Sequence, residues 1–86
     1  MKNLKIKLST FEDIKKFNEI ACKYESDIDV QAVGTRYIVD AKSILGLISL
    51  SMSRELQISI IPVNDMEERR FGYEFNEFRV CTDKEK

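Results

Sequence analysis

The chain has 86 residues, of which 43% are hydrophobic and 34% are charged, the composition of one small globular domain with a modest core. Its formal net charge of −1 excludes a nucleic-acid binder that depends on a strongly basic surface. No apolar run approaches the roughly 20 residues that span a bilayer, and residues 1–7 lack the apolar core of a signal peptide, so we expect a cytoplasmic protein that is not attached to a membrane.

Residues 4–8 alternate apolar and polar side chains, which predicts a strand with one buried face. A helix of about four turns is expected to follow. Its start has the spacing of a capping box at Ser9 and Glu12, or one residue later at Thr10 and Asp13. The apolar residues that recur at helical spacing and predict its buried face are Phe11, Ile14, Phe17, Ala21 and Tyr24.

A β-hairpin is predicted next. Residues 27–33 alternate in the manner of a second strand, and residues 37–39 favour a third strand because β-branched and aromatic side chains fit a pleated sheet. Between them, Gly34-Thr35-Arg36 is the strongest turn signal, since Gly34 can adopt a positive φ without steric cost.

Ser43 stands where a second helix is expected to begin. Its side chain can cap that helix by accepting a hydrogen bond from an amide of the first turn. The same hydroxyl lies at the positive end of the helix dipole, where a phosphate would be held favourably. Ile44, Leu45 and Leu47 cannot all face inward at helical spacing, so part of this patch should meet solvent or a partner. A purely structural cap on a core helix accounts for the same pattern.

Residues 55–61 alternate as a fourth strand, which Pro62 ends because it lacks a backbone donor. Asn64 or Asp65 can cap a last helix. Within that helix Gly72 is unfavourable, and the predicted inward stripe is Phe71, Phe75 and Phe78. We assign residues 1–81 to one domain and residues 82–86 to a charged tail.

The predicted order is βαββαβα, which gives an α+β fold with a four-stranded antiparallel sheet and three helices on one face. The chain contains no histidine, and Cys22 and Cys81 are far apart in sequence, so no metal site, cofactor or Cys–His catalysis is indicated. In a cytoplasmic setting we expect both thiols to be free, although a disulfide between them is the alternative. No paired side chains form a recognisable catalytic site, and we expect no enzyme.

Residues 39–50, Val-Asp-Ala-Lys-Ser-Ile-Leu-Gly-Leu-Ile-Ser-Leu, resemble the regulatory-serine segment of HPr, the small phosphocarrier of the bacterial sugar phosphotransferase system. Lys23-Tyr24 and Asp27-Ile28-Asp29-Val30 resemble the end of the first helix and the second strand of that family. The resemblance implies an open-faced β-sandwich and a role in the regulation of sugar uptake. It also implies that Ser43 is phosphorylated from ATP by a dedicated kinase, after which a transcriptional regulator docks.

The sequence departs from that family at four places. Phosphate-carrying members have a histidine and an arginine before the first helix, and these positions fall near Thr10 and Glu12. Because a threonine phosphate ester is far less reactive than a phosphohistidine, we expect no carrier reaction. Glu12 would repel a phosphate on Ser43 if the two lie close, the hairpin over residues 34–40 is about two residues longer than usual, and Glu55 replaces a glycine common after the short helix.

Two functions follow from these observations. The first is a non-catalytic HPr-like protein that binds protein partners, is not competent as a histidine phosphocarrier and is switched at Ser43. The second is a small-molecule-binding regulatory module of ferredoxin-like topology, which has the same order of strands and helices. Such modules often carry a glycine-rich turn after the first strand, and residues 8–11 contain no glycine.

Overall fold

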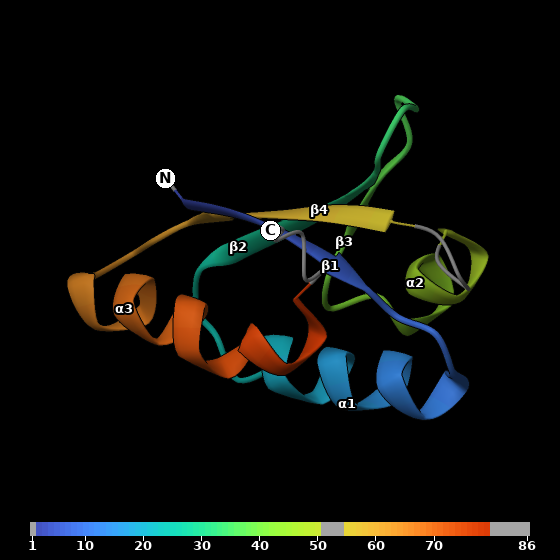
Figure 1. Ribbon diagram of the computed structural model, residues 1–86. Coiled ribbons are helices and arrows are strands. Elements are labelled where there is room, and N and C mark those ends of the chain that lie inside the picture. The colour runs from blue at the N-terminus through green and yellow to red at the C-terminus, as the bar shows by residue number, and fades with distance from the viewer. Residues whose placement is uncertain (1, 51–54, 80–86) are drawn as a thin grey trace, which may run out of the picture.

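The structure, a computed structural model, describes residues 2–50 and 55–79 (Figure 1). One antiparallel sheet lies over a layer of helices, and α1 and α3 both lie under the same face (Figure 1). The elements in chain order are β1 (Lys2–Lys7), α1 (Phe11–Ala21), β2 (Asp27–Ala32), β3 (Ile38–Asp40), α2 (Ile44–Leu50), β4 (Glu55–Ile61), α3 (Asp65–Glu74) and the 3-10 helix η1 (Asn76–Phe78). The α+β class and the predicted order of elements are therefore confirmed.

The strands pair in the order β1-β4-β2-β3. In register, Ile58 of β4 lies opposite Leu4 on one side and Val30 on the other, and Val30 lies opposite Val39. This order places β1 and β3 at the two edges of the sheet. A ferredoxin-like sheet has its first and third strands in the centre, so the ferredoxin-like alternative is wrong.

The core lies between the sheet and the helices, because the apolar residues of each strand alternate toward the helix side. An aromatic cluster fills the space between α1 and the C-terminal helices. The Phe17 ring lies 5.0 Å from that of Phe75 and 5.8 Å from that of Phe78, and Phe75 stacks on Tyr24 at 5.8 Å. The predicted Phe71, Phe75 and Phe78 stripe is buried, although α3 ends at Glu74 and Phe78 belongs to η1.

Tyr24 is 2% exposed, and its hydroxyl has no hydrogen-bond partner among the described residues. Burial raises the pKa of this phenol above its ordinary value. The Arg70 guanidinium covers the ring at 5.1 Å from its centroid and is itself held by Glu74, with N–O distances of 3.0–3.3 Å. Tyr24 is thus sealed between the core and α3.

Side-chain caps fix where two of the helices begin. Of the two predicted starts for α1, the structure has the second, because Thr10 Oγ1 accepts a hydrogen bond from the Asp13 amide at 3.1 Å. The Asn64 side chain caps α3 by accepting from the Glu67 amide at 2.8 Å. In both cases the local sequence determines the first turn.

Glu67 also ties α3 to the loop between α1 and β2. Its carboxylate accepts hydrogen bonds from the Glu25 amide at 3.0 Å, the Ser26 amide at 2.9 Å and the Ser26 hydroxyl. The same hydroxyl accepts from the Val63 amide at 2.9 Å. Glu67 is buried, and the Ser26 hydroxyl and the two amides hold the pKa of its carboxyl below the usual range although burial opposes them.

The turn of the β2–β3 hairpin points away from the helices, on the far side of the sheet (Figure 1). Gly34 has φ of 87°, which confirms the expected turn glycine. The sequence predicts a third strand that includes Tyr37, but β3 begins at Ile38, because Thr35 Oγ1 accepts from the Tyr37 amide and keeps that residue in the turn. Residues 80–86, which contain the end of the assigned domain, the charged tail and Cys81, lie outside the described residues, whereas Cys22 is exposed with a free thiol.

Candidate functional site

Ser43 immediately precedes α2 and is exposed, as its position in the sequence predicts. Its Oγ accepts a hydrogen bond from the Gly46 amide at 3.3 Å, and its carbonyl accepts from the Leu47 amide at 3.0 Å. The Ser43 amide donates to the Asp40 carbonyl at 2.9 Å, which closes the turn from β3 into the helix. The hydroxyl is therefore held at the first turn of α2 and remains accessible to solvent.

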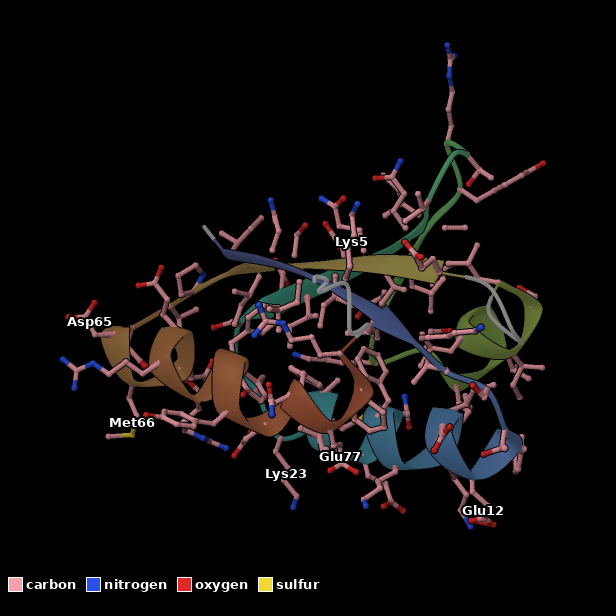
Figure 2. All side chains as sticks on the ribbon, viewed as in Figure 1. Lys5, Glu12, Lys23, Asp65, Met66 and Glu77 are labelled. Atoms are coloured by element: carbon pink, nitrogen blue, oxygen red, sulfur yellow. The ribbon has the colours of Figure 1, made fainter. Side chains whose placement is uncertain are left out.

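The turn before Ser43 is anchored on the second half of α1. Asn18 Nδ2 donates to the Ala41 carbonyl at 3.2 Å, and Cys22 Sγ lies 3.9 Å from the Lys42 carbonyl oxygen. Asn18 is six residues beyond Glu12, which corresponds to about 9 Å along a helix. In addition, the Glu12 side chain points away from α2, on the other side of α1 (Figure 2). The expected repulsion between Glu12 and a phosphate on Ser43 therefore has no short-range basis.

The predicted apolar patch is only partly at the surface. Leu45 is 77% exposed and Ile44 is half-buried against the core. Leu47 is fully buried, so its predicted role in direct partner contact is wrong: the α2 face that carries it packs against the core. Ile48, which is 38% exposed, takes its place beside Leu45. We call Ile44, Leu45 and Ile48 the α2 patch.

The close packing of α2 on the sheet depends on Gly46. A Cβ at this position would lie 3.1 Å from the Val39 Cβ of β3 and 3.3 Å from Ser43 Oγ. Glycine thus lets the first turn of α2 lie against β3 without displacing either neighbour. Gly46 therefore has two roles: its amide donates to the Ser43 cap, and its lack of a side chain allows α2 to lie close to β3.

Another exposed apolar residue lies at the start of α1, which packs against α2. Phe11 is expected from its spacing to belong to the buried face of α1, but about half of its side chain is exposed. It follows Thr10, whose hydroxyl is occupied by the cap of α1. The position of Phe11 accounts for this exposure, because Phe11 is the first residue of α1 and lies at the edge of the core.

Two charged residues lie within three positions of Ser43 in the sequence. Lys42, half-buried, is its neighbour in sequence, and the Asp40 carboxylate accepts from the Lys42 amide at 2.9 Å. Over residues 2–50 and 55–79, no group of His, Cys, Asp and Glu side chains is arranged to hold a metal ion. Two shallow hollows lie elsewhere, one along the charged face of α1 and one on α3 beside Tyr73. No helix in the described part of the chain is long and apolar enough to cross a membrane.

Comparison with protein families gives a match to the family described as "PTS HPr component phosphorylation site", over residues 13–71. The matched segment contains Ser43 and all of α2, and it begins after Thr10 and Glu12. Comparison with curated protein sequences found no match.

The solved structures that share this fold include two HPr proteins. HPr-C-His from Thermoanaerobacter tengcongensis matches with a TM-score of 0.68 and 25% identity, over 90% of this chain and 92% of that one. A phosphocarrier protein HPr from Bacillus anthracis str. Ames matches with a TM-score of 0.66 over 91% of this chain and 96% of that one, and at 19% identity it is evidence for the fold alone. The predicted open-faced β-sandwich is confirmed.

Proposed function

Because the chain belongs to the HPr family of the phosphotransferase system, we propose that it is a regulatory, partner-binding member that does not act as a histidine phosphocarrier and is switched by phosphorylation of Ser43. Members of the family are phosphocarriers and not catalysts. This chain would bind protein partners as a phosphocarrier does, but it would not transfer a phosphoryl group. One observation carries the proposal: Ser43 presents an exposed hydroxyl at the start of α2, beside the α2 patch, in a chain without histidine.

The carrier step requires a side chain whose phosphorylated form passes the group on. A phosphoimidazole does so readily, but the sequence contains no histidine. Thr10 lies near the place of that histidine, and its hydroxyl accepts the Asp13 amide as the cap of α1. A phosphate ester on threonine is stable and does not pass the phosphoryl group on. Thr10 therefore does not substitute for the missing histidine.

Phosphorylation of Ser43 would change charge without unfolding α2. The phosphate adds about −1.5 to −2 charges and three acceptor oxygens at the end of the helix where backbone amides point outward. The Gly46 amide, which now donates to Ser43 Oγ, can donate to a phosphate oxygen instead. The added charge would stand beside the exposed Leu45 and Ile48 side chains.

The α2 patch and the modified serine together would select partners. The unmodified surface offers an apolar contact centred on Leu45. The phosphorylated surface would disfavour an acidic or purely apolar partner and favour one that places arginine near Ser43, because guanidinium binds phosphate with paired hydrogen bonds. We infer that a kinase and a transcriptional regulator of the phosphotransferase system are partners of this kind.

Phosphorylation assays with two donor systems test the proposal. The purified chain is incubated with phosphoenolpyruvate and enzyme I, and separately with ATP and an HPr kinase, and intact mass is measured after each reaction. We expect one phosphate from ATP and none from phosphoenolpyruvate. The ATP-dependent phosphate should be absent from Ser43→Ala.

Matched variants make the result specific to Ser43 and to the α2 patch. Ser49→Ala removes another exposed hydroxyl of α2 and should leave the phosphorylation unchanged. Leu45→Asp should slow the kinase, because it places a charge in the apolar contact. Phosphate gained from phosphoenolpyruvate, or equal ATP-dependent phosphate in wild type and Ser43→Ala, would contradict the proposal.

A further inference from the structure

The outer edge of β3 carries no strand in the described sheet. Two backbone hydrogen bonds give the pattern of the β2–β3 ladder: the Ala41 amide donates to Ile28 at 2.9 Å, and the Ala32 amide donates to Tyr37 at 3.4 Å. In an antiparallel ladder, residues whose backbone N–H and C=O groups point to the neighbouring strand alternate with residues whose backbone groups point away from it. The backbone amides and carbonyls of residues 38 and 40 therefore point to the outer edge of the sheet.

The two edges of the sheet differ: a bridging residue covers part of β1, whereas only the short length of β3 and the charges that flank Ile38 limit pairing at its edge. On β1, Ile6 forms a bridge with Arg79, and the exposed Lys5 points to the open side of the sheet (Figure 2). Lysines and covering segments are common devices that prevent a strand from pairing with another molecule. β3 contains neither lysine nor proline, and Ile38 is 58% exposed on it.

The charges around Ile38 are self-complementary. Arg36 precedes it by two residues and Asp40 follows it by two, and both are exposed. If two β3 strands pair antiparallel with Ile38 opposite Ile38, Arg36 of each chain lies opposite Asp40 of the other. This register places Ile38 and Asp40, whose backbone groups point to the outer edge, at positions that hydrogen-bond between the two chains, and it requires the pairing to extend beyond the end of β3 to Arg36. The Asp40 carbonyl already accepts the Ser43 amide at 2.9 Å, and its second lone pair can accept a donor from the other chain.

Asp40 also has a like charge beside it within its own chain. Asp29 of β2 lies directly opposite Asp40, in a pair that is not joined by hydrogen bonds and whose side chains therefore lie close together. Like charges in this position are destabilising. Arg36 of a second chain would meet Asp40 from the other side and reduce this repulsion.

We propose that two copies of this chain associate through antiparallel pairing of their β3 edges, with Ile38 on the two-fold axis and Arg36 facing Asp40 of the other copy. The two four-stranded sheets would join into one continuous eight-stranded sheet. The interface is isologous, so it closes with two copies. Because β3 has only three residues, the dimer is weak and its population depends on protein concentration. The proposal does not depend on the function of Ser43.

Sedimentation velocity from about 10 μM to about 1 mM, the range in which a weak complex forms, tests the proposal. The weight-average mass of the wild type should rise from 10.0 kDa toward twice that value. Arg36→Glu and Asp40→Lys should each remain monomeric, because each places like charges opposite one another. An equimolar mixture of the two variants should dimerise, since the introduced glutamate then faces the introduced lysine while the unchanged Arg36 faces the unchanged Asp40.

Two further variants distinguish pairing at the β3 edge from a general effect of charge. Arg69→Glu makes the same charge change on the exposed face of α3 and should leave dimerisation unchanged. Ile38→Lys keeps the bond between Asp40 and the Lys42 amide but places two lysines on the axis, so it should be monomeric. A wild type that stays monomeric throughout, an Arg36→Glu variant that behaves like Arg69→Glu, or a mixture that does not recover the dimer would each overturn the proposal.

Discussion

Glu67 and Ser26 are joined by two hydrogen bonds, because the Glu67 carboxylate accepts both the amide and the hydroxyl of Ser26 across 41 residues of sequence. Together with the bond from the Glu25 amide, they hold the end of α1 and the start of β2 against α3. The pair is buried, so its loss is not compensated by water.

Replacement of Glu67 by glutamine should lower the free energy of unfolding by about 1–3 kcal/mol, the range for a buried charged acceptor that loses its partners. Glutamine keeps the size of the side chain, but one of its two oxygens becomes an NH₂ group that faces an amide donor. Urea denaturation of wild type and Glu67→Gln measures the difference. Asp65→Asn removes the same charge from an exposed position in the same first turn of α3, and as the matched control it should change stability by less.

The contribution of Glu67 should also depend on pH. Its pKa is lower in the folded chain than in the unfolded one, chiefly because of the Ser26 hydroxyl, so the folded state binds this proton more weakly. The stabilisation is complete above the ordinary glutamate pKa of about 4.3 and is lost as the pH falls through the lower folded value. The stability difference between wild type and Glu67→Gln should therefore shrink below about pH 4. A constant difference between pH 7 and pH 3 would contradict this linkage.

Leu45 and Leu47 should respond oppositely to truncation although they are two residues apart. Leu47→Ala should destabilise the fold by about 2–5 kcal/mol, because it leaves a cavity in the core. Leu45→Ala should change stability by no more than about 0.5 kcal/mol, because the side chain is exposed. Thermal or urea unfolding of both variants tests which face of α2 is available to a partner. Equal effects would show that the helix is turned differently on the sheet.

Gly46 and Gly72 should likewise differ, although both lie in helices. A Cβ at Gly72 has no atom within 4 Å, so Gly72→Ala should stabilise the fold by roughly 0.5–1 kcal/mol. Gly46→Ala should destabilise it, because the new Cβ lies 3.1 Å from that of Val39. Val39→Ala keeps the Cβ of that residue but removes the Cγ1 that would lie 3.3 Å from the new methyl group, so it should relieve part of the steric conflict, which a double-mutant cycle detects as coupling of about 0.5 kcal/mol or more.

Ser43→Asp should keep α2 intact. Aspartate is as good an N-cap as serine, and its charge is favourable at this end of a helix, so stability should change by no more than about 0.5 kcal/mol. Ser43→Ala removes the acceptor for the Gly46 amide and should cost about 0.5–1 kcal/mol, the low end for a cap, because that bond is 3.3 Å long. Circular dichroism and urea unfolding measure both. Unfolding by Ser43→Asp would contradict a switch that acts through charge at an intact helix.

Local features of the fold were predictable where one segment determines them. Ser43 and Asn64 are caps whose acceptors lie three residues from their donors, and the alternation along β4 fixes which of its side chains face the core. These features depend only on the spacing between residues of one segment, which can be read directly from the sequence.

Features that depend on packing were not predictable from spacing. Leu47 and Ile48 are both large aliphatic residues that fit either face of the helix, and only the packing of α2 on the core shows that Leu47 is buried and Ile48 is partly exposed. The Glu67–Ser26 bonds join segments far apart in the chain, and a first-turn glutamate is accounted for equally well by the helix dipole. The exposure of Phe11 depends on where α1 begins relative to the core.

Because Tyr24 is buried, its absorbance and fluorescence should report on the unfolding of this protein. The chain has no tryptophan, and of its three tyrosines Tyr37 and Tyr73 are exposed in the native state. Changes in near-ultraviolet absorbance or fluorescence on unfolding should therefore arise mainly from Tyr24, which lies beside Phe75 and beneath Arg70. Its phenolate should form in alkaline solution only as the chain opens, so a spectrophotometric titration would follow the loss of the contact between α3 and the turn that follows α1 without any added label.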